Sequence, residues 1–294
     1  MKIRIGILTR NKKSWCSSQL RRALDERNIE AICFNFTDLV ARVNEKPYVS
    51  FDNLDLLKDL SAMIVRPIGR CSLEEIIFQL DLLHKLYKNG LKVINQPSAI
   101  EKAADKYYTL SIFEESGLPV PKTIATRNVE EALKAFRDFG GEAIIKPLFG
   151  SKGIGTARIS DIDVAERTFR TLKFYRNVIY IQEFIPHQNK DVRAFVIGDE
   201  VIACMQRIAN SWKTNVSKGA RPIKMDSMAD IEDLSIKAAQ AIGCEVAGVD
   251  LIETEKGPII IEINSQPGWS GLQSTTDIDI AGKIIDYVIQ QVKR

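Results

Sequence analysis

The feature that most constrains the fold is a change in the pattern of apolar residues at Gly117-Leu118-Pro119. Before this point, strand-like runs alternate with helix-like segments, at 3–8, 17–27, 31–36 and 62–65. After it, strand-like runs follow one another more directly, at 179–184, 193–197 and 201–207. The first pattern is typical of a mostly parallel α/β layer and the second of an antiparallel α+β fold. The sequence therefore predicts both arrangements in one chain.

The segment 73–87 is the clearest helix in the first part of the chain. Its apolar residues recur at helical spacing and would share one face: Leu73, Ile76, Ile77, Leu80, Leu83 and Tyr87. Asn89-Gly90 ends this helix, and a short strand is expected at 92–94. Ser98 is expected to cap the helix that follows.

The composition excludes several classes of function. The 294 residues carry 41 Lys and Arg against 38 Asp and Glu, a net charge of +3 that is too small and too evenly spread for a nucleic-acid-binding protein. Two histidines leave little room for a histidine-rich zinc site or a Ser-His-Asp triad. The five cysteines form no Cys-x-x-Cys pair, as in reduced cytosolic proteins. No apolar run resembles a signal peptide or a membrane span, so we expect a cytoplasmic protein with no membrane partner.

A glycine-rich turn at 150–155 is a candidate phosphate-binding loop, because glycines let backbone N–H groups approach an anion closely. Gly150 and Gly155 have Walker A spacing, but Thr156-Ala157 replaces the Lys-Ser/Thr pair and a strand-like run follows. The turn is therefore not a P-loop. A plain structural turn remains the alternative.

Two strand-like runs near the C-terminal end contain the strongest candidate site. A three-residue hairpin loop at 255–257 would place Asp250 opposite Glu262, with Asn264 on the same face as Glu262. Opposed carboxylates repel each other unless a cation lies between them. Oxygen ligands without His or Cys suit Mg²⁺ or Mn²⁺. The alternative is an exposed polar face.

Other polar groups lie at the ends of strand-like runs. Lys146 ends an apolar run just before the glycine turn, where its ammonium would reach a phosphate. Residues 182–186 end another run, and their backbone would suit an adenine edge. Taken singly, lysines such as Lys106 and Lys146 are more often solvated surface groups. Five further candidates lie in the strands and loop that follow: Asp191, Arg193, Arg207, Lys213 and Asn215.

Taken in order, these segments resemble the ATP-grasp superfamily and, within it, the RimK-like glutamate ligases. The resemblance is carried by Ile145-Lys146-Pro147, Gly150-Ser151-Lys152-Gly153-Ile154-Gly155, Gln182-Glu183-Phe184-Ile185, Asp191-Val192-Arg193, Gln206-Arg207, Trp212-Lys213-Thr214-Asn215, Lys218-Gly219, Ala247-Gly248-Val249-Asp250 and Glu262-Ile263-Asn264-Ser265-Gln266-Pro267-Gly268. It implies an N-terminal α/β domain at 1–97 and a two-lobed α+β ATP-grasp domain at 98–294. The smaller lobe would span about 98–178 and the larger about 179–294.

The resemblance also implies a role for each candidate residue. ATP would be bound by Lys106, Lys146, Gly150, Ser151, Gly153, Gly155, Glu183, Phe184, Ile185, Asp191, Lys213 and Asn215. Within this set, the lysines and glycines would contact phosphates, residues 183–185 the adenine and Asp191 the ribose. Asp250, Glu262 and Asn264 would ligate two Mg²⁺ or Mn²⁺ ions. Arg207 would be catalytic, stabilising the reacting acyl phosphate.

The implied reaction forms an amide through an acyl phosphate. A substrate carboxylate attacks the γ-phosphorus of ATP, and the amine of an amino acid then displaces phosphate. Metal ions and fixed positive charge supply most of the catalysis in such chemistry. A chain with two histidines can therefore carry it out.

The first third of the chain, with Val65-Arg66-Pro67-Ile68-Gly69-Arg70, is more similar to the archaeal family members that glutamylate coenzymes. Lys218-Gly219-Ala220 also stands where RimK-like protein ligases often have Arg-Gly-Gly, and Gln273 where they have Glu. We expect L-glutamate to be added to a small acceptor with an acidic tail, bound by Arg66, Arg70 and Arg193. For Arg66 and Arg70, ordinary charges at a strand end are the alternative.

The leading acceptor is tetrahydromethanopterin, which would give tetrahydrosarcinapterin. A deazaflavin coenzyme and the C-terminal glutamate of a ribosomal protein are alternatives in the same class. A non-catalytic ATP-binding regulatory module is an alternative of another class. The resemblance further implies a homo-oligomer, and we expect no nucleic-acid partner.

Overall fold

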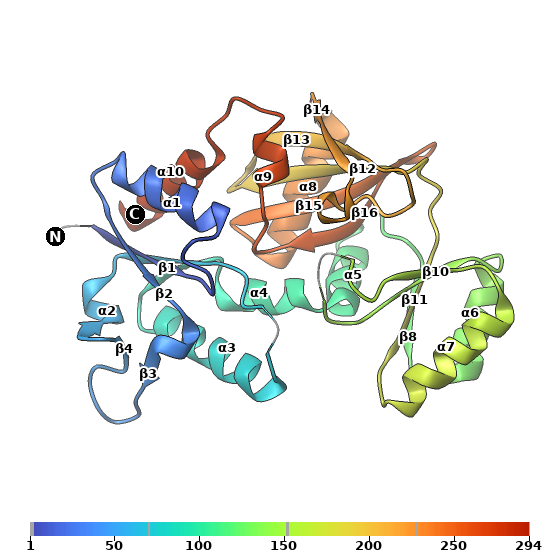
Figure 1. The fold of residues 1–294 in the computed structure, drawn as a ribbon, viewed down its shortest axis with the longest axis horizontal. Coiled ribbons are helices and arrows are strands. Elements are labelled where there is room, and N and C mark those ends of the chain that lie inside the picture. The colour runs from blue at the N-terminus through green and yellow to red at the C-terminus, as the bar shows by residue number, and fades with distance from the viewer. Residues whose placement is uncertain (1–2, 70, 151–152, 227, 294) are drawn as a thin grey trace.

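The computed structural model describes residues 3–69, 71–150, 153–226 and 228–293. The N-terminal region is built on a parallel sheet with the strand order β2-β1-β6-β7 (Figure 1). The strands are β1 (Arg4–Leu8), β2 (Glu30–Phe34), β6 (Ala62–Val65) and β7 (Lys92–Ile94). Ile5 and Ile7 pack on one face with α1 (Trp15–Asp25), and Leu8 packs on the other. Both faces are apolar and covered, as a parallel sheet requires, so the predicted α/β layer is confirmed.

Helix α3 (Leu73–Lys88) forms where the sequence predicts it, and a capping box of Ser72 and Glu75 fixes its start. Its buried side chains all lie in the second half of the helix: Leu82, Leu83 and Leu86. Leu73 is 74% exposed and Ile77 is 51% exposed, so the apolar face expected from the spacing is largely open to solvent. The expected face is therefore only partly buried: Leu83 belongs to the core and Leu80 packs against it, whereas the first turns of the helix extend beyond the core.

Two short helices, α4 (Pro97–Ala104) and α5 (Lys106–Glu115), lead out of the N-terminal region. Helix α4 begins with a proline, which suits a first turn because its missing N–H needs no partner there. The expected cap Ser98 therefore lies inside the helix. Asp105 caps α5 by accepting two backbone N–H groups at 2.9 and 3.0 Å, which fixes Lys106 at the first helical position.

A small antiparallel sheet, β3-β4-β5, extends the N-terminal region, and no sequence pattern had indicated it. Its strands are β3 (Leu39–Ala41), β4 (Val49–Phe51) and β5 (Leu54–Asp55), followed by α2 (Leu56–Asp59). Val49 and Leu56 join the core on the α3 side of the parallel sheet. Three further short helices occur elsewhere: η1 (Phe36–Asp38), η2 (Val216–Lys218) and α9 (Ser270–Gln273).

The small lobe is an antiparallel sheet in the order β10-β9-β11-β8, with two helices packed on it (Figure 1). Its elements are β8 (Thr123–Thr126), α6 (Val129–Asp138), β9 (Ala143–Lys146), β10 (Ala157–Ile159), α7 (Ile162–Phe174) and β11 (Ile179–Glu183). Asn128 and Asp161 cap the two helices. Phe136 and Phe169 belong to the lobe's buried core. The glycine turn connects β9 to β10 and so lies at one edge of this sheet.

The large lobe is a five-stranded antiparallel sheet in the order β14-β13-β12-β15-β16. Its strands are β12 (Lys190–Ile197), β13 (Glu200–Ile208), β14 (Arg221–Met225), β15 (Val246–Thr254) and β16 (Gly257–Asn264). Helix α8 (Ala229–Ile242) covers one face, where Ile231 and Ala238 share a core with Val192 and Val249. The antiparallel α+β pattern predicted for the second part of the chain is confirmed.

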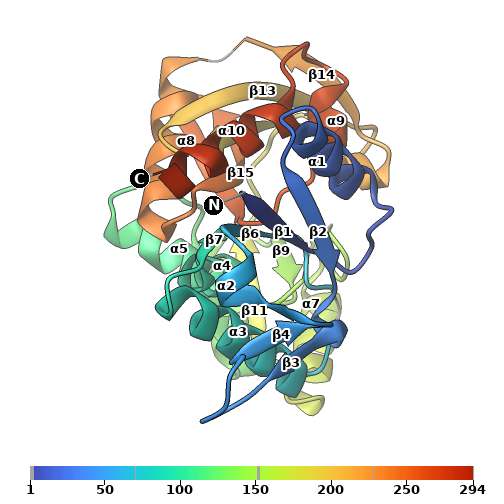
Figure 2. The ribbon, with the colours of Figure 1, turned by 90° about the vertical axis from the view of Figure 1, so that its left-hand side faces the viewer.

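The N-terminal sheet and the large lobe share one hydrophobic core. Ile5 and Ile7 belong to the same buried cluster as Phe195 of β12 and Trp269. Helix α10 (Ile280–Lys293) packs against α1, and the views in Figures 1 and 2 both show the two helices side by side. The predicted domain boundary between residues 97 and 98 stays a prediction. Helix α10 belongs to the second predicted domain but packs against α1 of the first.

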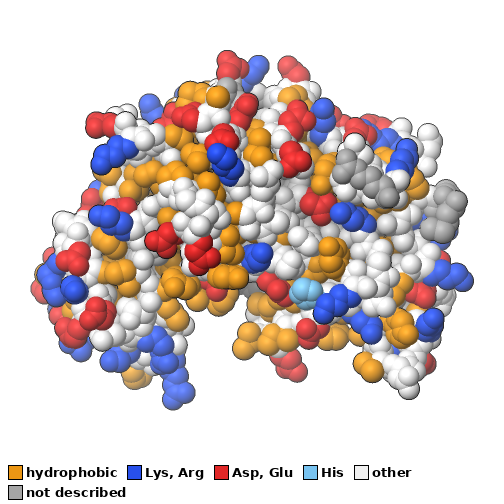
Figure 3. Space-filling view, turned by 180° about the vertical axis from the view of Figure 1, so that it is seen from behind, with side chains coloured by type: hydrophobic (Ala, Val, Ile, Leu, Met, Phe, Trp, Pro, Cys, Tyr) orange, Lys and Arg blue, Asp and Glu red, His pale blue; other side chains and the backbone are white. Residues whose placement is uncertain are grey.

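The surface gives no sign of a membrane span. Among the described residues, no helix is long and apolar enough to cross a bilayer. On the face shown in Figure 3, basic and acidic side chains are interspersed. This face therefore carries no broad patch of a single sign of charge.

Candidate active site

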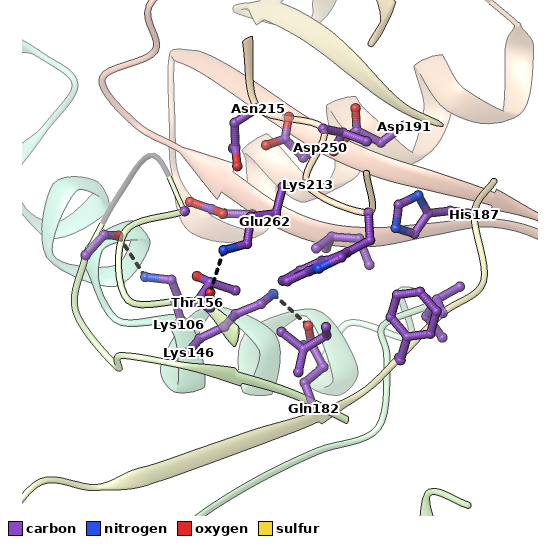
Figure 4. A pocket seen from close by; sticks show the side chains of 18 of the residues that line it. Lys106, Lys146, Thr156, Gln182, His187, Asp191, Lys213, Asn215, Asp250 and Glu262 are labelled. Atoms are coloured by element: carbon purple, nitrogen blue, oxygen red, sulfur yellow. Dashed lines mark hydrogen bonds between the residues drawn. The ribbon is translucent and has the colours of Figure 1, made fainter. Parts of the chain in front are cut away.

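A cleft between the small and large lobes brings together residues from most of the predicted motifs (Figure 4). It contains about 870 Å³ of empty space, part of which is open to solvent. Predicted site residues that line it are Lys106, Lys146, Gly150, Gly153, Glu183, Phe184, Ile185, Asp191, Arg207, Lys213, Asn215, Asp250 and Glu262. A cavity of this size with convergent charged groups is typical of a small-molecule site.

The β15–β16 hairpin differs from the predicted one at its turn but agrees at its carboxylates. The turn has two residues rather than three, because Thr254 pairs with Gly257. Gly257 has a φ of +108°, which its missing Cβ allows. A bulge at Ile261 compensates this shift of one residue, so that Asp250 still pairs with Glu262. The predicted opposition of the two carboxylates is therefore confirmed, although the predicted loop length was wrong.

Asp250 lies in a buried row of alternating charges on three neighbouring strands. Arg193 of β12 contacts it through Nε to Oδ1 at 2.5 Å and through Nη2 to Oδ2 at 2.9 Å. Arg207 of β13 approaches Oδ1 of Asp250 with Nη2 at 3.0 Å. Arg207 also donates to both carboxylate oxygens of Asp191, at 2.7 and 2.5 Å. Burial alone would lower the pKa of Arg207, but the carboxylates of Asp250 and Asp191 raise it above its usual value.

The oxygen atoms at this end of the hairpin fit a divalent metal ion. Glu262 faces Asp250, and Asn264 lies two residues further along β16. Oδ1 of Asp250 is buried and lacks a hydrogen bond of ordinary geometry, despite its close arginine contacts. In the part of the chain that the structure describes, no three His, Cys, Asp or Glu side chains gather closely enough to hold a metal. A site here therefore needs the Asn264 amide and oxygens of a bound substrate, which is how Mg²⁺ is commonly held.

Two lysines face these carboxylates. Nζ of Lys106 donates to Gly150 O at 2.8 Å, and Nζ of Lys146 donates to Gln182 Oε1 at 2.7 Å (Figure 4). Burial lowers the pKa of both ammonium groups, that of Lys146 to about 8, while the negative charge of Glu262 opposes the shift. Both cations are therefore poorly neutralised and will favour an anionic ligand.

The glycine turn is held from the large lobe. Gly153 and Gly155 have φ of +64° and +77°, conformations that strain residues with a Cβ. A Cβ on Gly153 would lie 2.6 Å from Oδ1 of Asn215, and Nζ of Lys213 donates to Thr156 O at 2.9 Å. Asn215 and Lys213 of the large lobe thus meet the turn, and their predicted role in binding ATP stays a prediction. Ser151, also predicted for ATP, lies outside the described residues.

The predicted adenine segment lies at the end of β11. Oε1 of Glu183 accepts the Lys122 backbone N–H at 2.7 Å, which fixes this strand end to the start of β8. The guanidinium of Arg158 lies 3.8 Å from the centre of the Phe184 ring. Phe184 and Ile185 contribute an apolar wall to the cleft.

Three predicted substrate or nucleotide residues are already engaged by protein groups or are not described. Asp191, expected to hold the ribose, is paired with Arg207 and also accepts a hydrogen bond from Thr214 Oγ1 at 2.5 Å. Arg66 is buried, donates to Pro267 O at 2.9 Å and lies 4.8 Å from the centre of the Trp269 ring. Arg70 lies outside the described residues. Of the predicted substrate-binding arginines, Arg193 is therefore the one that the structure places directly beside Asp250.

The structure adds residues to the cleft to which the sequence analysis assigned no role. His187 lines it, as does Trp212 of the motif at 212–215, and Nδ1 of His187 is buried without a hydrogen-bond partner. Burial lowers the pKa of His187, so its imidazole is neutral at pH 7. His187 follows Ile185 by two residues, and a polar side chain next to the predicted adenine segment was the only available signal.

Two antiparallel α+β lobes, with lysines and a glycine turn facing opposed carboxylates across their cleft, define an enzyme of the ATP-grasp class. A family model described as the RimK-like ATP-grasp domain matches residues 103–288. The chain belongs to the RimK-like ATP-grasp family. The expected fold class, the family and the assignment as an ATP-dependent ligase are confirmed.

Relatives of known name extend over the whole chain. The chain is 35% identical to the tetrahydromethanopterin:alpha-L-glutamate ligase of Methanocaldococcus jannaschii, over 99% of this chain and 100% of the relative. It is 32% identical to the ligase of the same name from Methanosarcina acetivorans, over 97% of this chain and 98% of the relative. With a probable alpha-L-glutamate ligase of Rhodopirellula baltica it shares 31% identity, over 99% of this chain and 72% of the relative.

Solved structures share the fold at low sequence identity. The ATP-grasp ligase PsnB, complexed with minimal precursor, Mg and ADP, superposes with a TM-score of 0.77 at 20% identity, over 99% of this chain and 98% of PsnB. The RimK domain ATP-grasp protein of Sphaerobacter thermophilus gives a TM-score of 0.74 at 21% identity, over 97% and 99% of the two chains. These likenesses show the two-lobed architecture with its N-terminal region.

Proposed function

We propose that the protein adds L-glutamate to the acidic tail of tetrahydromethanopterin, giving tetrahydrosarcinapterin, in an ATP-dependent reaction. The observation that carries this proposal is the meeting of Lys106 and Lys146 with the opposed carboxylates of Asp250 and Glu262 in one cleft. The acceptor is inferred from two full-length relatives that bear the name of this activity.

The basic residues of the cleft are placed to hold the phosphates of ATP. Lys106, Lys146 and Lys213 each donate to a neutral oxygen, at 2.8, 2.7 and 2.9 Å. Phosphate oxygens are charged and accept stronger hydrogen bonds, so they would replace these neutral acceptors. The glycine turn adds backbone N–H groups that suit an anion.

Asp250, Glu262 and Asn264 would hold two Mg²⁺ or Mn²⁺ ions. When bound, such ions neutralise charge on the transferring phosphoryl group. Arg193 and Arg207 form ion pairs with Asp250 in its buried position, because each brings a guanidinium within 3.0 Å of its carboxylate.

The reaction has two steps. An oxygen of the acceptor carboxylate attacks the γ-phosphorus of ATP, and the bond to the bridging oxygen breaks, giving an acyl phosphate and ADP. The amine of L-glutamate then attacks the acyl carbon, a proton is released, and phosphate leaves as the amide forms. Arg207 is fixed by Asp191 and Asp250, so its guanidinium is held ready to stabilise the acyl phosphate and the tetrahedral oxyanion.

Product analysis tests this proposal. We expect incubation with ATP, Mg²⁺, L-glutamate and tetrahydromethanopterin to release ADP and to increase the mass of the acceptor by one glutamyl residue. Parallel incubations with a deazaflavin coenzyme and with a ribosomal protein ending in glutamate separate the alternative acceptors. Nucleotide binding without ADP release in any of these mixtures would contradict the ligase assignment and favour a regulatory module.

We also propose that the protein acts in the cytoplasm as a homo-oligomer. Among the described residues the five cysteines form no disulfide bond, which suits a reducing compartment. Size-exclusion chromatography with light scattering measures the oligomeric state, and a monomer at micromolar concentration would contradict this part of the proposal.

A further inference from the structure

Arg193 and Arg207 both contact Asp250, but they differ in what else they contact. Arg207 has a second carboxylate, Asp191, which accepts two of its hydrogen bonds. For Arg193, Asp250 is the one acidic side chain within ion-pair distance among the residues that the structure describes. Loss of Asp250 as a partner would therefore leave Arg207 paired and Arg193 unpaired.

Arg193 is buried, and its guanidinium occupies space that is available because residue 248 is a glycine. The side chains of Arg193 and Asp250 are 12% and 8% exposed. The guanidinium lies over Gly248 of β15, where a Cβ would be 2.2 Å from Nη1 of Arg193 and 3.0 Å from Cβ of Pro267. Gly248 pairs with Asn264, so the guanidinium lies between the proposed metal ligands and the loop that follows them.

The contact between Arg193 and Asp250 is only partly directed: Nη2 donates to Oδ2 at 2.9 Å, whereas the second contact lacks ordinary hydrogen-bond geometry. Nε of Arg193 lies 2.5 Å from Oδ1 of Asp250, yet neither atom makes a hydrogen bond of ordinary geometry. Charge attraction thus accounts for much of this contact, and the hydrogen-bonding capacity of both groups is incompletely used. A pair of this kind can exchange partners more readily than a fully aligned one.

Together these contacts suggest a change of partner during the catalytic cycle. A divalent ion at Asp250 would compete with Arg193 for the same oxygens and repel its guanidinium. A buried guanidinium without a carboxylate is strongly unfavourable, so it must find another one. The substrates of the proposed reaction carry carboxylates.

We propose that Arg193 pairs with Asp250 while the metal site is empty and with a carboxylate of the acidic substrate once Asp250 ligates the metal. This inference rests on the proposed function. It makes substrate binding depend on prior binding of the metal–nucleotide complex, and by linkage each of the two strengthens the other. Arg193 is thus a specificity residue for an acidic substrate and also the group that sets the order of binding.

Isothermal titration calorimetry on the full chain tests this order without turnover. L-glutamate serves as the amine substrate, and glutarate serves as a carboxylate-only mimic of the acidic tail. Each is titrated into the protein alone and into the protein with Mg²⁺ and a non-hydrolysable ATP analogue. We expect at least one of them to bind about tenfold or more tightly with the nucleotide present, within the range typical of coupled sites. The ligand that shows the dependence identifies the carboxylate that Arg193 takes.

Two variants separate the exchange from a general effect of the nucleotide. Asp250→Asn frees Arg193 without metal, so we expect its affinity for the responding ligand to rise in the absence of nucleotide and to lose its nucleotide dependence. Arg193→Gln should still bind the Mg²⁺–nucleotide complex but lose the gain in ligand affinity. Arg27→Gln, which removes an exposed ion pair with Asp286, is the matched control and should behave as the wild type does.

The outcomes distinguish this inference from the proposed function. Equal affinity for the ligands with and without the nucleotide would overturn the exchange while leaving the ligase assignment intact. Retention of the nucleotide-dependent gain by Arg193→Gln would also overturn it. Absence of any glutamate or glutarate binding to a nucleotide-loaded wild-type protein would count against both. The comparison on the wild-type protein needs no variant, so the test remains decisive if a substitution prevents folding.

Discussion

The two sides of the cleft hold their charges in different ways. Lys106 and Lys146 donate to a backbone carbonyl and a side-chain amide, which carry no net charge. On the large-lobe side, Asp250 is neutralised by Arg193 and Arg207. An incoming phosphate can replace a neutral acceptor at little electrostatic cost, whereas separating a buried ion pair leaves a charge behind. Lys106 and Lys146 can therefore accept an anionic ligand directly. Asp250 changes its partner only when another cation replaces one of the two arginines.

The largest loss of turnover is expected on the large-lobe side of the cleft, where Asp250 is ion-paired. Asp250→Asn removes one of the two opposed carboxylates while preserving side-chain shape, and we expect turnover to fall about 100- to 1000-fold, as for loss of a key electrostatic group. ADP release measures turnover, and circular dichroism with thermal melting checks that the fold is retained. Near wild-type turnover in a folded Asp250→Asn protein would contradict the metal assignment.

At the lysine side, Lys146→Met should lower turnover about 100-fold, because the phosphate loses a charge-assisted partner.

The same variant tests how burial of the Lys146 ammonium affects the stability of the fold. Burial lowers the pKa of Lys146 from 10.5 to about 8, so between these values the unfolded chain binds a proton that the native chain has released. The contribution of Lys146 to stability therefore rises with pH across this window, and its charged form is a cost below it.

The pH dependence gives the decisive comparison for Lys146. We expect the free energy of unfolding of the wild type, relative to Lys146→Met, to increase from pH 8 to pH 10. Nucleotide affinity of the wild type should fall above pH 8, as the free ammonium loses its proton. Denaturant titrations and nucleotide calorimetry at several pH values measure both. Parallel pH curves for the two proteins would show that Lys146 is not buried as a charged group.

The glycine turn between the two sides allows a matched test. Gly153→Ala places a Cβ 2.6 Å from Oδ1 of Asn215 in a backbone with φ of +64°. Gly140→Ala meets the same backbone strain, with φ of +83°, but no atom within 4 Å. We expect about a tenfold loss of nucleotide affinity for Gly153→Ala, and a loss of stability without loss of affinity for Gly140→Ala. Equal nucleotide affinities of the two variants would exclude a role for the contact with Asn215.

The smallest effect is expected at Lys213, which contacts the neutral Thr156 carbonyl across the lobes at 2.9 Å. Lys213→Met should change the free energy of unfolding by less than about 1 kcal/mol, since one neutral acceptor is left without its donor. Nucleotide affinity should fall only a few-fold. A loss of turnover as large as that of Lys146→Met, measured by ADP release, would place Lys213 with the essential cations.

The carboxylate pair shows why parts of the site can be predicted from sequence. Asp250 and Glu262 were placed opposite each other from strand alternation and the position of one glycine. The predicted turn was one residue too long, and the bulge at Ile261 corrected the error. A bulge depends on packing against neighbouring strands, which a single sequence does not contain. The turn is one residue shorter than predicted and the bulge adds one residue. These two deviations cancel, so Asp250 still pairs with Glu262.

Other features depend on tertiary contacts and could not be anticipated. Helical spacing predicted α3, but Leu73 and Ile77 in its first turns are exposed, so periodicity alone does not show how much of an apolar face is buried. Asp191 and Arg207 are cross-strand partners in the β12–β13 pair, and this engages a carboxylate that the resemblance assigns to the ribose. His187 lines the cleft from the loop between β11 and β12, and the path of such a loop is set by the packing of the two lobes.

The shared core of α1, α10 and the N-terminal sheet has a consequence for biosynthesis. Ile5 and Ile7 are synthesised long before Ile284 and Ile285, which belong to the same cluster. During translation at about 5–20 residues per second, α1 covers this face of the sheet first, and residues of β12, β13 and α10 join the cluster later. The N-terminal region therefore completes its core only after α10 has been synthesised. Until then, the nascent chain presents an apolar surface that must be protected from aggregation.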